Sequence, residues 1–197
     1  GHDRLWINQD ESDGLLTRLK DGTMVNYSGK DIHSRVMALR IDANGELYVA
    51  SEGESNYIFH FDNDYERFVN LSLPIPYNFT GNFEVNDLLP EKDTIWLATT
   101  QGLFYQTSNE LRRLELGDKL TELSAKAITK SGKDLWFSNT YGLIKYDLNT
   151  QDFIIFNESS GLPSRSGNGK ALRIDNQGFL WVGSARGMAY TKLNQSA

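Results

Sequence analysis

The stretch Ile174-Asp175-Asn176-Gln177-Gly178-Phe179-Leu180-Trp181-Val182-Gly183-Ser184, near the end of the chain, contains the pattern that decides the fold. An Asp-to-Gly turn leads into a short run in which an indole lies between two aliphatic residues, and Gly187 follows six residues after Trp181. Asp, Asn and Gly are typical of tight turns, and short alternating runs beside such turns are typical of β-strands. The stretch therefore predicts neighbouring strands of an antiparallel sheet.

The aromatic strand recurs along the whole chain at intervals of 40 to 48 residues. Its five copies are Leu5-Trp6-Ile7, Leu47-Tyr48-Val49, Ile95-Trp96-Leu97, Leu135-Trp136-Phe137 and Leu180-Trp181-Val182. In the last three copies, a Gly and an apolar residue come six residues after the aromatic one, as Gly102-Leu103, Gly142-Leu143 and Gly187-Met188. A period of this length is the signature of a repeat architecture.

Each repeat contains four short strand patterns. An apolar run such as 36–41 precedes the aromatic strand, an alternating run such as 143–146 follows it, and a further run such as 153–156 completes the unit. A four-stranded meander of this size cannot bury both of its faces alone, so neighbouring units must stack, and radial stacking gives a propeller. The sequence therefore predicts an all-β fold, a fragment of a β-propeller built from four-stranded antiparallel meanders.

The two chain ends set the expected number of blades. The chain opens with the last three strands of one unit and closes with the first three of another, which predicts about five blades, three complete and two incomplete. The expected repeats cover residues 1–33, 34–82, 83–122, 123–168 and 169–197 of a single partial propeller. Because the two ends overlap instead of completing one blade, we expect an open arc, whose exposed strand edges favour a homodimer.

The recurring aromatic residues are expected to be structural. They are Trp6, Tyr48, Trp96, Trp136 and Trp181. The same residue type at the same place in every unit is what packing between blades requires, since a large flat ring fills the space between two sheets. These five are therefore not candidates for ligand contact.

Composition excludes several functional classes. The formal charge of −6 and the pI near 5.1 give no basic field for a phosphate backbone, so we expect no nucleic acid partner. No apolar run approaches the roughly 18 residues of a spanning helix, so we expect no membrane contact within this segment. Zero Cys excludes a thiolate nucleophile and a Cys-based zinc site. The start at Gly1-His2, without Met, suggests remains of a purification tag and a cut inside a longer protein.

Residues that could carry catalysis or bind a metal are few. His33 and His60 stand in different repeats and have no Asp or Glu at metal-ligand spacing, so we expect no metal site and no cofactor. The acidic run Asp62-Asn63-Asp64-Tyr65-Glu66 resembles the start of a calcium loop but lacks its Gly and distal Glu, which favours a solvated hairpin turn. The sequence shows no nucleophile elbow and no phosphate-binding Gly loop, so we expect no enzyme activity in this segment.

Residues 171–190, 95–105 and 135–146 resemble the two-component regulator propeller repeat, and the resemblance extends more loosely to the first two copies. That family has an Asp and Gly turn, an aliphatic-Trp-aliphatic strand and then Gly-Leu with an aromatic residue. Ser160-Gly161-Leu162-Pro163-Ser164 is similar to the linker before the first strand of such repeats. The resemblance implies the periplasmic sensor region of a Bacteroidetes-type hybrid histidine kinase, anchored in the inner membrane. It also implies that oligosaccharides from polysaccharide breakdown are sensed to control polysaccharide utilisation.

Two loops are candidates for ligand contact, because loops that leave outer strands re-enter a propeller near its channel. The first carries Tyr77, Asn78 and Phe79. The rings of Tyr77 and Phe79 can stack on a sugar or pack beneath their own loop. The second carries Arg165 and Asn168, which can donate hydrogen bonds to hydroxyls or a carboxylate. Two hypotheses follow: a sensor that binds an oligosaccharide, or an interaction scaffold that dimerises without a small ligand.

Overall fold

A computed structural model of the chain shows an all-β protein. It describes residues 4–8, 15–27, 32, 35–52, 58–71, 83–107, 110–117, 120–121, 123–165 and 167–193. Within these residues, the secondary structure consists of β-strands and one 3-10 helix, η1 (Glu158–Ser160). The strands belong to five antiparallel sheets, three with four strands and two with three.

The sheets are numbered 1 to 5 in chain order. Sheet 1 contains β1 (Leu5–Asn8), β2 (Leu15–Arg18) and β3 (Met24–Asn26). Sheet 2 contains β4 (Val36–Ile41), β5 (Leu47–Ser51), β6 (Ile58–Asp62) and β7 (Arg67–Asn70). Sheet 3 contains β8 (Val85–Pro90), β9 (Ile95–Thr99), β10 (Gly102–Gln106) and β11 (Leu111–Arg113). Sheet 4 contains β12 (Ala127–Ser131), β13 (Asp134–Ser138), β14 (Leu143–Asp147) and β15 (Phe153–Phe156). Sheet 5 contains β16 (Gly167–Ile174), β17 (Phe179–Ser184) and β18 (Gly187–Lys192).

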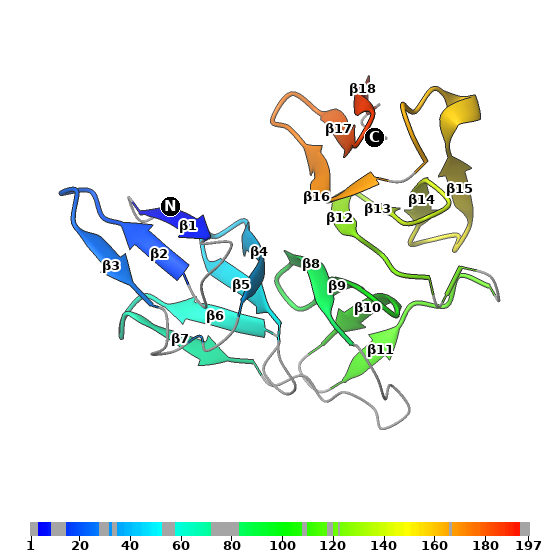
Figure 1. Cartoon of the computed structure of the whole chain (residues 1–197). Coiled ribbons are helices and arrows are strands. Elements are labelled where there is room, and N and C mark those ends of the chain that lie inside the picture. The colour runs from blue at the N-terminus through cyan, green and yellow to red at the C-terminus, as the bar shows by residue number, and fades with distance from the viewer. Residues whose placement is uncertain are drawn as a thin grey trace.

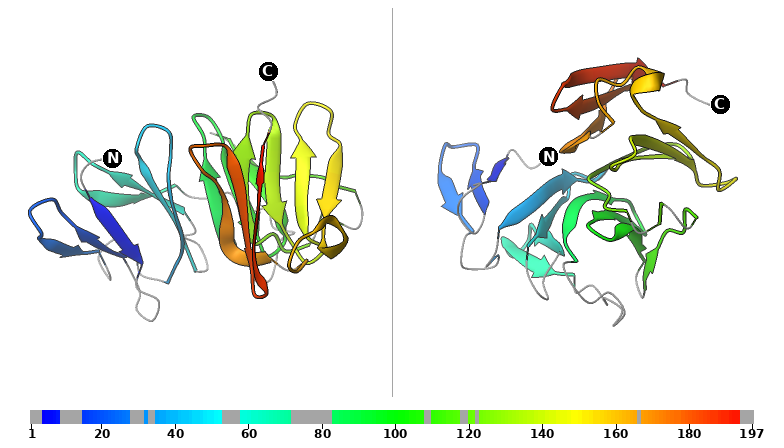
Figure 2. Two further views of the ribbon diagram at one scale, coloured as in Figure 1. Left: turned by 90° about the horizontal axis from the view of Figure 1, so that it is seen from above. Right: turned by 45° about the vertical axis from the view of Figure 1, so that its right-hand side comes forward.

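Each sheet is a meander in which consecutive strands pair, and the sheets follow one another along a curved path (Figure 1). Strands β4, β8, β12 and β16 lie toward the middle of the molecule, and β7, β11 and β15 lie at its outside (Figure 1). The strands of sheets 3 to 5 stand side by side in the view from above (Figure 2). The predicted class, an all-β propeller made of antiparallel meanders, is confirmed.

The alternation of side chains along the aromatic strand gives each sheet two apolar faces. In β9, Trp96 and Ala98 belong to the core between sheets 3 and 4, whereas Leu97 belongs to the core between sheets 2 and 3. In β13, Trp136 faces sheet 5, whereas Leu135 and Phe137 face sheet 3. The aromatic residue of one sheet therefore packs against the aliphatic face of the next.

The five recurring aromatic residues differ in what covers them. Trp6 lies against sheet 2, with its ring centroid 4.7 Å from that of Phe61, and Tyr48 lies against the core between sheets 2 and 3. Trp96 and Trp136 are 8% and 5% exposed in the next two cores. Trp181 lies on the face of sheet 5 that points away from sheet 4, and it remains partly exposed.

The Gly that follows the aromatic strand is required by backbone geometry. Gly142 begins the turn into β14 with φ of +144°, and a Cβ at this position would overlap the carbonyl oxygen of Phe156 on the neighbouring strand. Gly102 occupies the same place in sheet 3, with φ of +115°, against the carbonyl oxygen of Thr121. The chain can therefore close these turns only where a side chain is missing.

We expect Gly142→Ala to lower the free energy of unfolding by about 3 kcal/mol or more, because the added methyl meets backbone in a conformation disfavoured for L-residues. Gly132→Ala is the matched control, since Gly132 has φ of +55° but no atom within 4 Å of a Cβ, and we expect it to cost only about 1 kcal/mol. Urea denaturation of both variants measures the difference. Equal losses would show that the close approach is unimportant.

Candidate functional site

The segments that connect one sheet to the next fill three of the four spaces between sheets. Tyr27 and Ile32 belong to the core between sheets 1 and 2, and Leu71 and Phe83 pack in the next one. Between sheets 3 and 4 the connection contributes several leucines, namely Leu114, Leu116, Leu120 and Leu123. Sheets 4 and 5 differ, because their described connecting residues contribute one side chain to the core, the partly buried Leu162.

A cavity of about 1150 Å³ lies in this less filled space between sheets 4 and 5. The inner strands β12 and β16 lie against each other, so the space opens toward the outer strands. Its apolar lining comes from both sheets and from the connection: Trp136, Leu143, Ile154, Phe156, Leu162, Leu180, Val182, Ala189, Tyr190 and Leu193. Its polar lining includes Asp134 and three lysines: Lys133, Lys145 and Lys192. Apolar walls with a few polar groups are what a small-molecule site needs.

Ion pairs hold the charged groups at the mouth of this cleft. Lys145 Nζ lies 2.7 Å from Asp134 Oδ2, and Lys133 Nζ lies 2.7 Å from Asp147 Oδ2. The bond from Lys133 is the largest cause that lowers the pKa of Asp147 to about 2. Each of these two lysines is thus paired with a carboxylate, so the two pairs add little net charge to the cleft between sheets 4 and 5.

The connection between sheets 4 and 5 is ordered by its own hydrogen bonds. The Asn157 side chain accepts from Ser159 N at 2.9 Å, and Gly161 ends η1 in a left-handed conformation with φ of +93°. The lowered pKa of Glu158 is caused first by backbone hydrogen bonds and then by the charges of Arg165 and Arg186. Ser160, Gly161 and Leu162 line the cleft, so this connection forms one of its borders.

The two predicted ligand residues that the structure describes, Arg165 and Asn168, are not part of the lining of the cleft. Arg165 is exposed near Glu158, and Asn168 is exposed within β16, which begins at Gly167. Tyr77, Asn78 and Phe79 lie outside the described residues, so their role remains a prediction. The sequence reasoning missed the cleft because its walls belong to strands that look like any other repeat.

His60 lies beside an acidic side chain that its spacing along the sequence does not indicate. Its Nε2 lies 3.3 Å from Glu46 Oε2, and its ring centroid lies 4.9 Å from that of Tyr48. The hairpin between β5 and β6 brings the residues together, although 14 positions separate them.

No group of three or more His, Asp or Glu side chains in the described part of the chain could hold a metal ion. The Asp62 side chain accepts from Asp64 N at 3.0 Å, as in a hairpin turn.

A buried ion pair connects the inner strands of three sheets. Asp87 on β8 is fully buried, and its Oδ2 accepts from Arg40 Nη2 on β4 at 2.6 Å and from Ile128 N on β12 at 3.1 Å. Burial raises the pKa of Asp87, and the Arg40 charge opposes that effect. These hydrogen bonds join the inner strands of sheets 2, 3 and 4, so the pair supports the scaffold.

Comparisons with known proteins agree with this architecture. No protein-family model matches the sequence. The extracellular domain of the hybrid two-component system BT4673 from B. thetaiotaomicron matches 98% of this chain with a TM-score of 0.74 and 19% identity. That of BT3049 from the same organism matches 96% with a TM-score of 0.71 and 20% identity. The chain has the β-propeller fold of these extracellular domains. Virginiamycin B lyase from Staphylococcus aureus also matches 96% of the chain, with a TM-score of 0.67 and 19% identity.

A sequence match to a histidine kinase covers a shorter stretch of the chain. Fifty-four residues, 27% of this propeller chain, are 39% identical to histidine kinase P4 of Formosa agariphila, and they cover 4% of that kinase. The chain spans 26% of each of the two ectodomains and 66% of the lyase. Among the described residues, no helix is long and apolar enough to cross a membrane.

The Asp87–Arg40 pair allows a test of how the inner strands stabilise the protein. We expect Asp87→Ala to lower the free energy of unfolding by about 3–5 kcal/mol, because it leaves a half-buried guanidinium and the Ile128 N–H without their acceptor. In an Arg40→Ala background the same change should cost at least about 1 kcal/mol less, since the two residues are in contact. Urea denaturation of the four proteins gives the coupling energy. Additive losses would show that the pair is not coupled.

Proposed function

We propose that this chain is a propeller segment of the extracytoplasmic sensor region of a two-component regulator, and that it binds an oligosaccharide to control polysaccharide utilisation. The match to two ectodomains of hybrid two-component systems over 96–98% of the chain supports the sensor role. The stretch that is 39% identical to a histidine kinase supports it independently. The observation that carries ligand binding is the cleft of about 1150 Å³, with its aromatic and aliphatic walls, between sheets 4 and 5.

The proposed segment is periplasmic and acts by binding, not by catalysis. The acids Asp87 and Asp147 are engaged by Arg40 and Lys133, and no group of three or more His, Asp or Glu side chains in the described residues could hold a metal ion. The lyase with the same fold shows that a propeller can also carry an enzyme, so the fold alone does not decide. In this proposal an inner-membrane kinase in the same protein receives the signal.

Within this proposal, the loops extend the contact surface of the cleft. Arg165 and Asn168 are exposed on the segment whose residues 160–162 border the cleft, so they can donate hydrogen bonds to the outer units of an oligosaccharide. Tyr77, Asn78 and Phe79 remain proposed contacts from the connection between sheets 2 and 3. The five-bladed open arc, with three-stranded sheets at its two ends, is also part of this proposal.

We expect at least one neutral oligosaccharide to raise the melting temperature of this chain by roughly 5–10 °C at a concentration 100-fold above its Kd. A ligand that binds only the folded state contributes about 2.7 kcal/mol at that concentration, and each kcal/mol shifts the melting temperature of a domain of this size by about 2–4 °C. Differential scanning fluorimetry with a panel of plant and algal oligosaccharides measures the shift. Polyethylene glycol at equal mass concentration is the control, and a panel without any specific shift contradicts oligosaccharide sensing.

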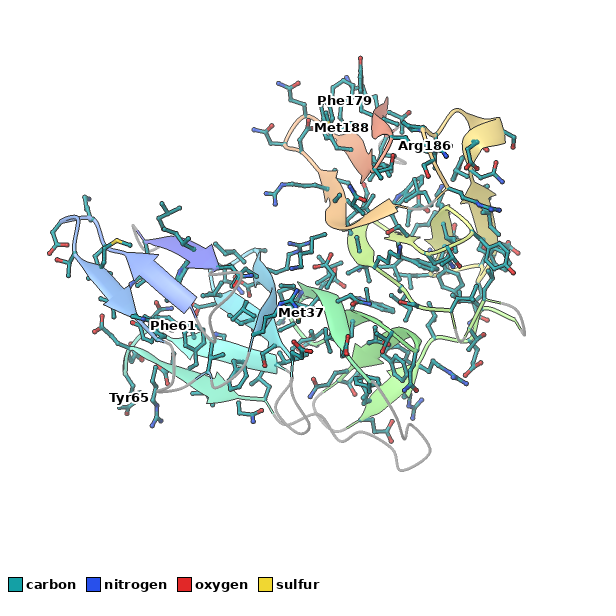
Figure 3. All side chains as sticks on the ribbon, viewed as in Figure 1. Met37, Phe61, Tyr65, Phe179, Arg186 and Met188 are labelled. Carbon is teal, nitrogen blue, oxygen red and sulfur yellow. The ribbon has the colours of Figure 1, made fainter. Side chains whose placement is uncertain are left out.

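The alternative function, an interaction scaffold, has its own supporting observation at the two ends of the arc. Sheet 5 exposes the aromatic side of its strands, where Met188 and Tyr190 are 66% and 64% exposed. Met188 is labelled on this sheet in Figure 3. Sheet 1 exposes the aliphatic side of its first strand, with Leu5 at 57% and Ile7 at 37%. These are the two kinds of face that pack together between every pair of neighbouring sheets in the chain. The occupant proposed for sheet 5 is therefore sheet 1 of a second copy, in a head-to-tail contact.

If this association occurs, sedimentation velocity should show a mass that increases with protein concentration, because a head-to-tail contact leaves both outer ends free. The double variant Met188→Glu, Tyr190→Glu should remain monomeric at every concentration, since two carboxylates then face the aliphatic sheet. Tyr141→Glu, at an exposed turn of sheet 4, is the matched control and should behave as the wild type. A wild-type chain that is monomeric at all concentrations contradicts the scaffold.

A further inference from the structure

The strand register identifies one position that differs in sheet 4. In sheets 2 to 5 the aromatic residue has a cross-strand partner on the inner strand, and the residue two places after that partner lies on the same face as the aromatic ring. The partners are Arg40, Leu89, Thr129 and Arg173. The residues two places later are Asp42, Glu91, Ser131 and Asp175. Sheet 4 alone among these four has a residue without a carboxylate there.

In two sheets this carboxylate accepts the indole hydrogen bond. Trp96 Nε1 donates to Glu91 Oε2 at 3.1 Å, and Trp181 Nε1 donates to Asp175 Oδ2 at 2.8 Å. The bond from Trp181 is the first cause of a lowered pKa for Asp175. Each of these indoles therefore has an acceptor supplied by its own hairpin, whether or not another sheet covers the ring.

Trp136 lacks that acceptor. Its Nε1 is buried and has no hydrogen-bond partner among the described residues, although the side chain is only 5% exposed. A buried donor without a partner is destabilising, because it has lost its hydrogen bond to water and gained no acceptor in the protein. The Ser131 side chain is shorter than Glu91 or Asp175, which explains why the hairpin does not satisfy Trp136.

An acceptor without a partner lies on the same face of the same strand. Asp134 Oδ2 is paired with Lys145 Nζ at 2.7 Å, but Asp134 Oδ1 is buried and has no partner among the described residues. Asp134 precedes Trp136 by two residues, so the two side chains are neighbours along β13. Both residues line the cleft between sheets 4 and 5. One buried donor and one buried acceptor are thus left open at a single site.

We propose that this cleft is the binding site for a neutral ring molecule bearing hydroxyl groups, which accepts from Trp136 Nε1 and donates to Asp134 Oδ1. A hydroxyl is both donor and acceptor, so it matches the two open groups, whereas a carboxylate can accept from Trp136 Nε1 but has no hydrogen to donate to Asp134 Oδ1. Phe156, stacked on Trp136 with ring centroids 5.8 Å apart, and the exposed Ile154 offer apolar surface to the ligand ring. This assignment rests on the sensing function proposed above and adds to it a location and a ligand chemistry.

Access to Trp136 requires a small movement of the lining. Nε1 is covered in the unliganded protein, so a bound hydroxyl reaches it when a neighbouring side chain changes rotamer. Ile154 lines the cleft and is 56% exposed on the outer strand β15, where few neighbours restrain it. Rotamer changes of exposed side chains take picoseconds to nanoseconds, so this movement does not limit binding.

The test restores the missing carboxylate. The variants Ser131→Glu and Ser131→Asp reproduce the residues of sheets 3 and 5, so either should give Trp136 its own acceptor and raise the melting temperature of the unliganded chain. Methyl β-glucoside is the probe, and the four indole N–H signals of a ¹⁵N-labelled sample are the readout. The Trp136→Phe variant assigns the relevant signal. We expect that signal to shift saturably in the wild type, and the affinity to fall at least tenfold in both Ser131 variants.

Asn176→Glu is the matched control, because it adds the same charge to an exposed hairpin turn of sheet 5 and should leave the affinity unchanged. A wild-type Trp136 signal that does not shift, or equal affinity in the wild type and a folded Ser131 variant, would overturn the assignment. If oligosaccharides raise the melting temperature while the Trp136 signal stays fixed, sensing stands and this cleft is not its site. If methyl β-glucoside shifts the signal while no oligosaccharide stabilises the chain, the cleft assignment stands and sensing fails.

Discussion

The packing of an aromatic residue from one sheet against the aliphatic face of the next is the contact on which the fold depends. A sheet of three or four short strands buries too little area alone, whereas one buried large apolar side chain contributes about 1.5–3 kcal/mol. Trp96 and Trp136 make this contact at full burial, together with Leu135 and Leu180 from the facing sheets. Because the contact repeats in one direction along the chain, each sheet needs a neighbour on both sides.

A cleft forms at one interface because the aromatic contact has less support there than at its neighbour. Two features support the aromatic contact between sheets 3 and 4. Apolar residues from the connection fill the outer part of the space, and an acid at the hairpin accepts the hydrogen bond of the indole N–H. Between sheets 3 and 4, Leu116 and Leu120 provide the filling and Glu91 provides the acceptor. Between sheets 4 and 5 the described connection provides Leu162 and the hairpin provides Ser131. Both supports are thus reduced where the cavity lies.

The strand pattern could be predicted closely, because a period-two alternation and turn residues depend on local chemistry. The expected outer strand 153–156 coincides with β15, and the expected inner strand 36–41 coincides with β4. The cleft could not be predicted, since it results from side-chain volume supplied by a connection and not from a motif. The proximity of His60 to Glu46 was also missed, because a hairpin register decides it. The turn 131–134 did contain the relevant signal, the missing acid, which becomes visible only when the repeats are aligned by register.

The recurring indole has two requirements, a sheet that covers its ring and an acceptor for its N–H, and Trp136 and Trp181 each meet only one of them. Trp181 has its acceptor, Asp175, but no sheet of this chain covers its ring. Trp136 has a covering sheet, but no acceptor from its hairpin. The hydrogen bond is therefore not a by-product of packing, because it forms both at the partly exposed Trp181 and at the buried Trp96, whereas it is missing at the buried Trp136. Packing against the next sheet holds the propeller together, while the hairpin residue decides whether an indole N–H is satisfied internally or remains open to a ligand.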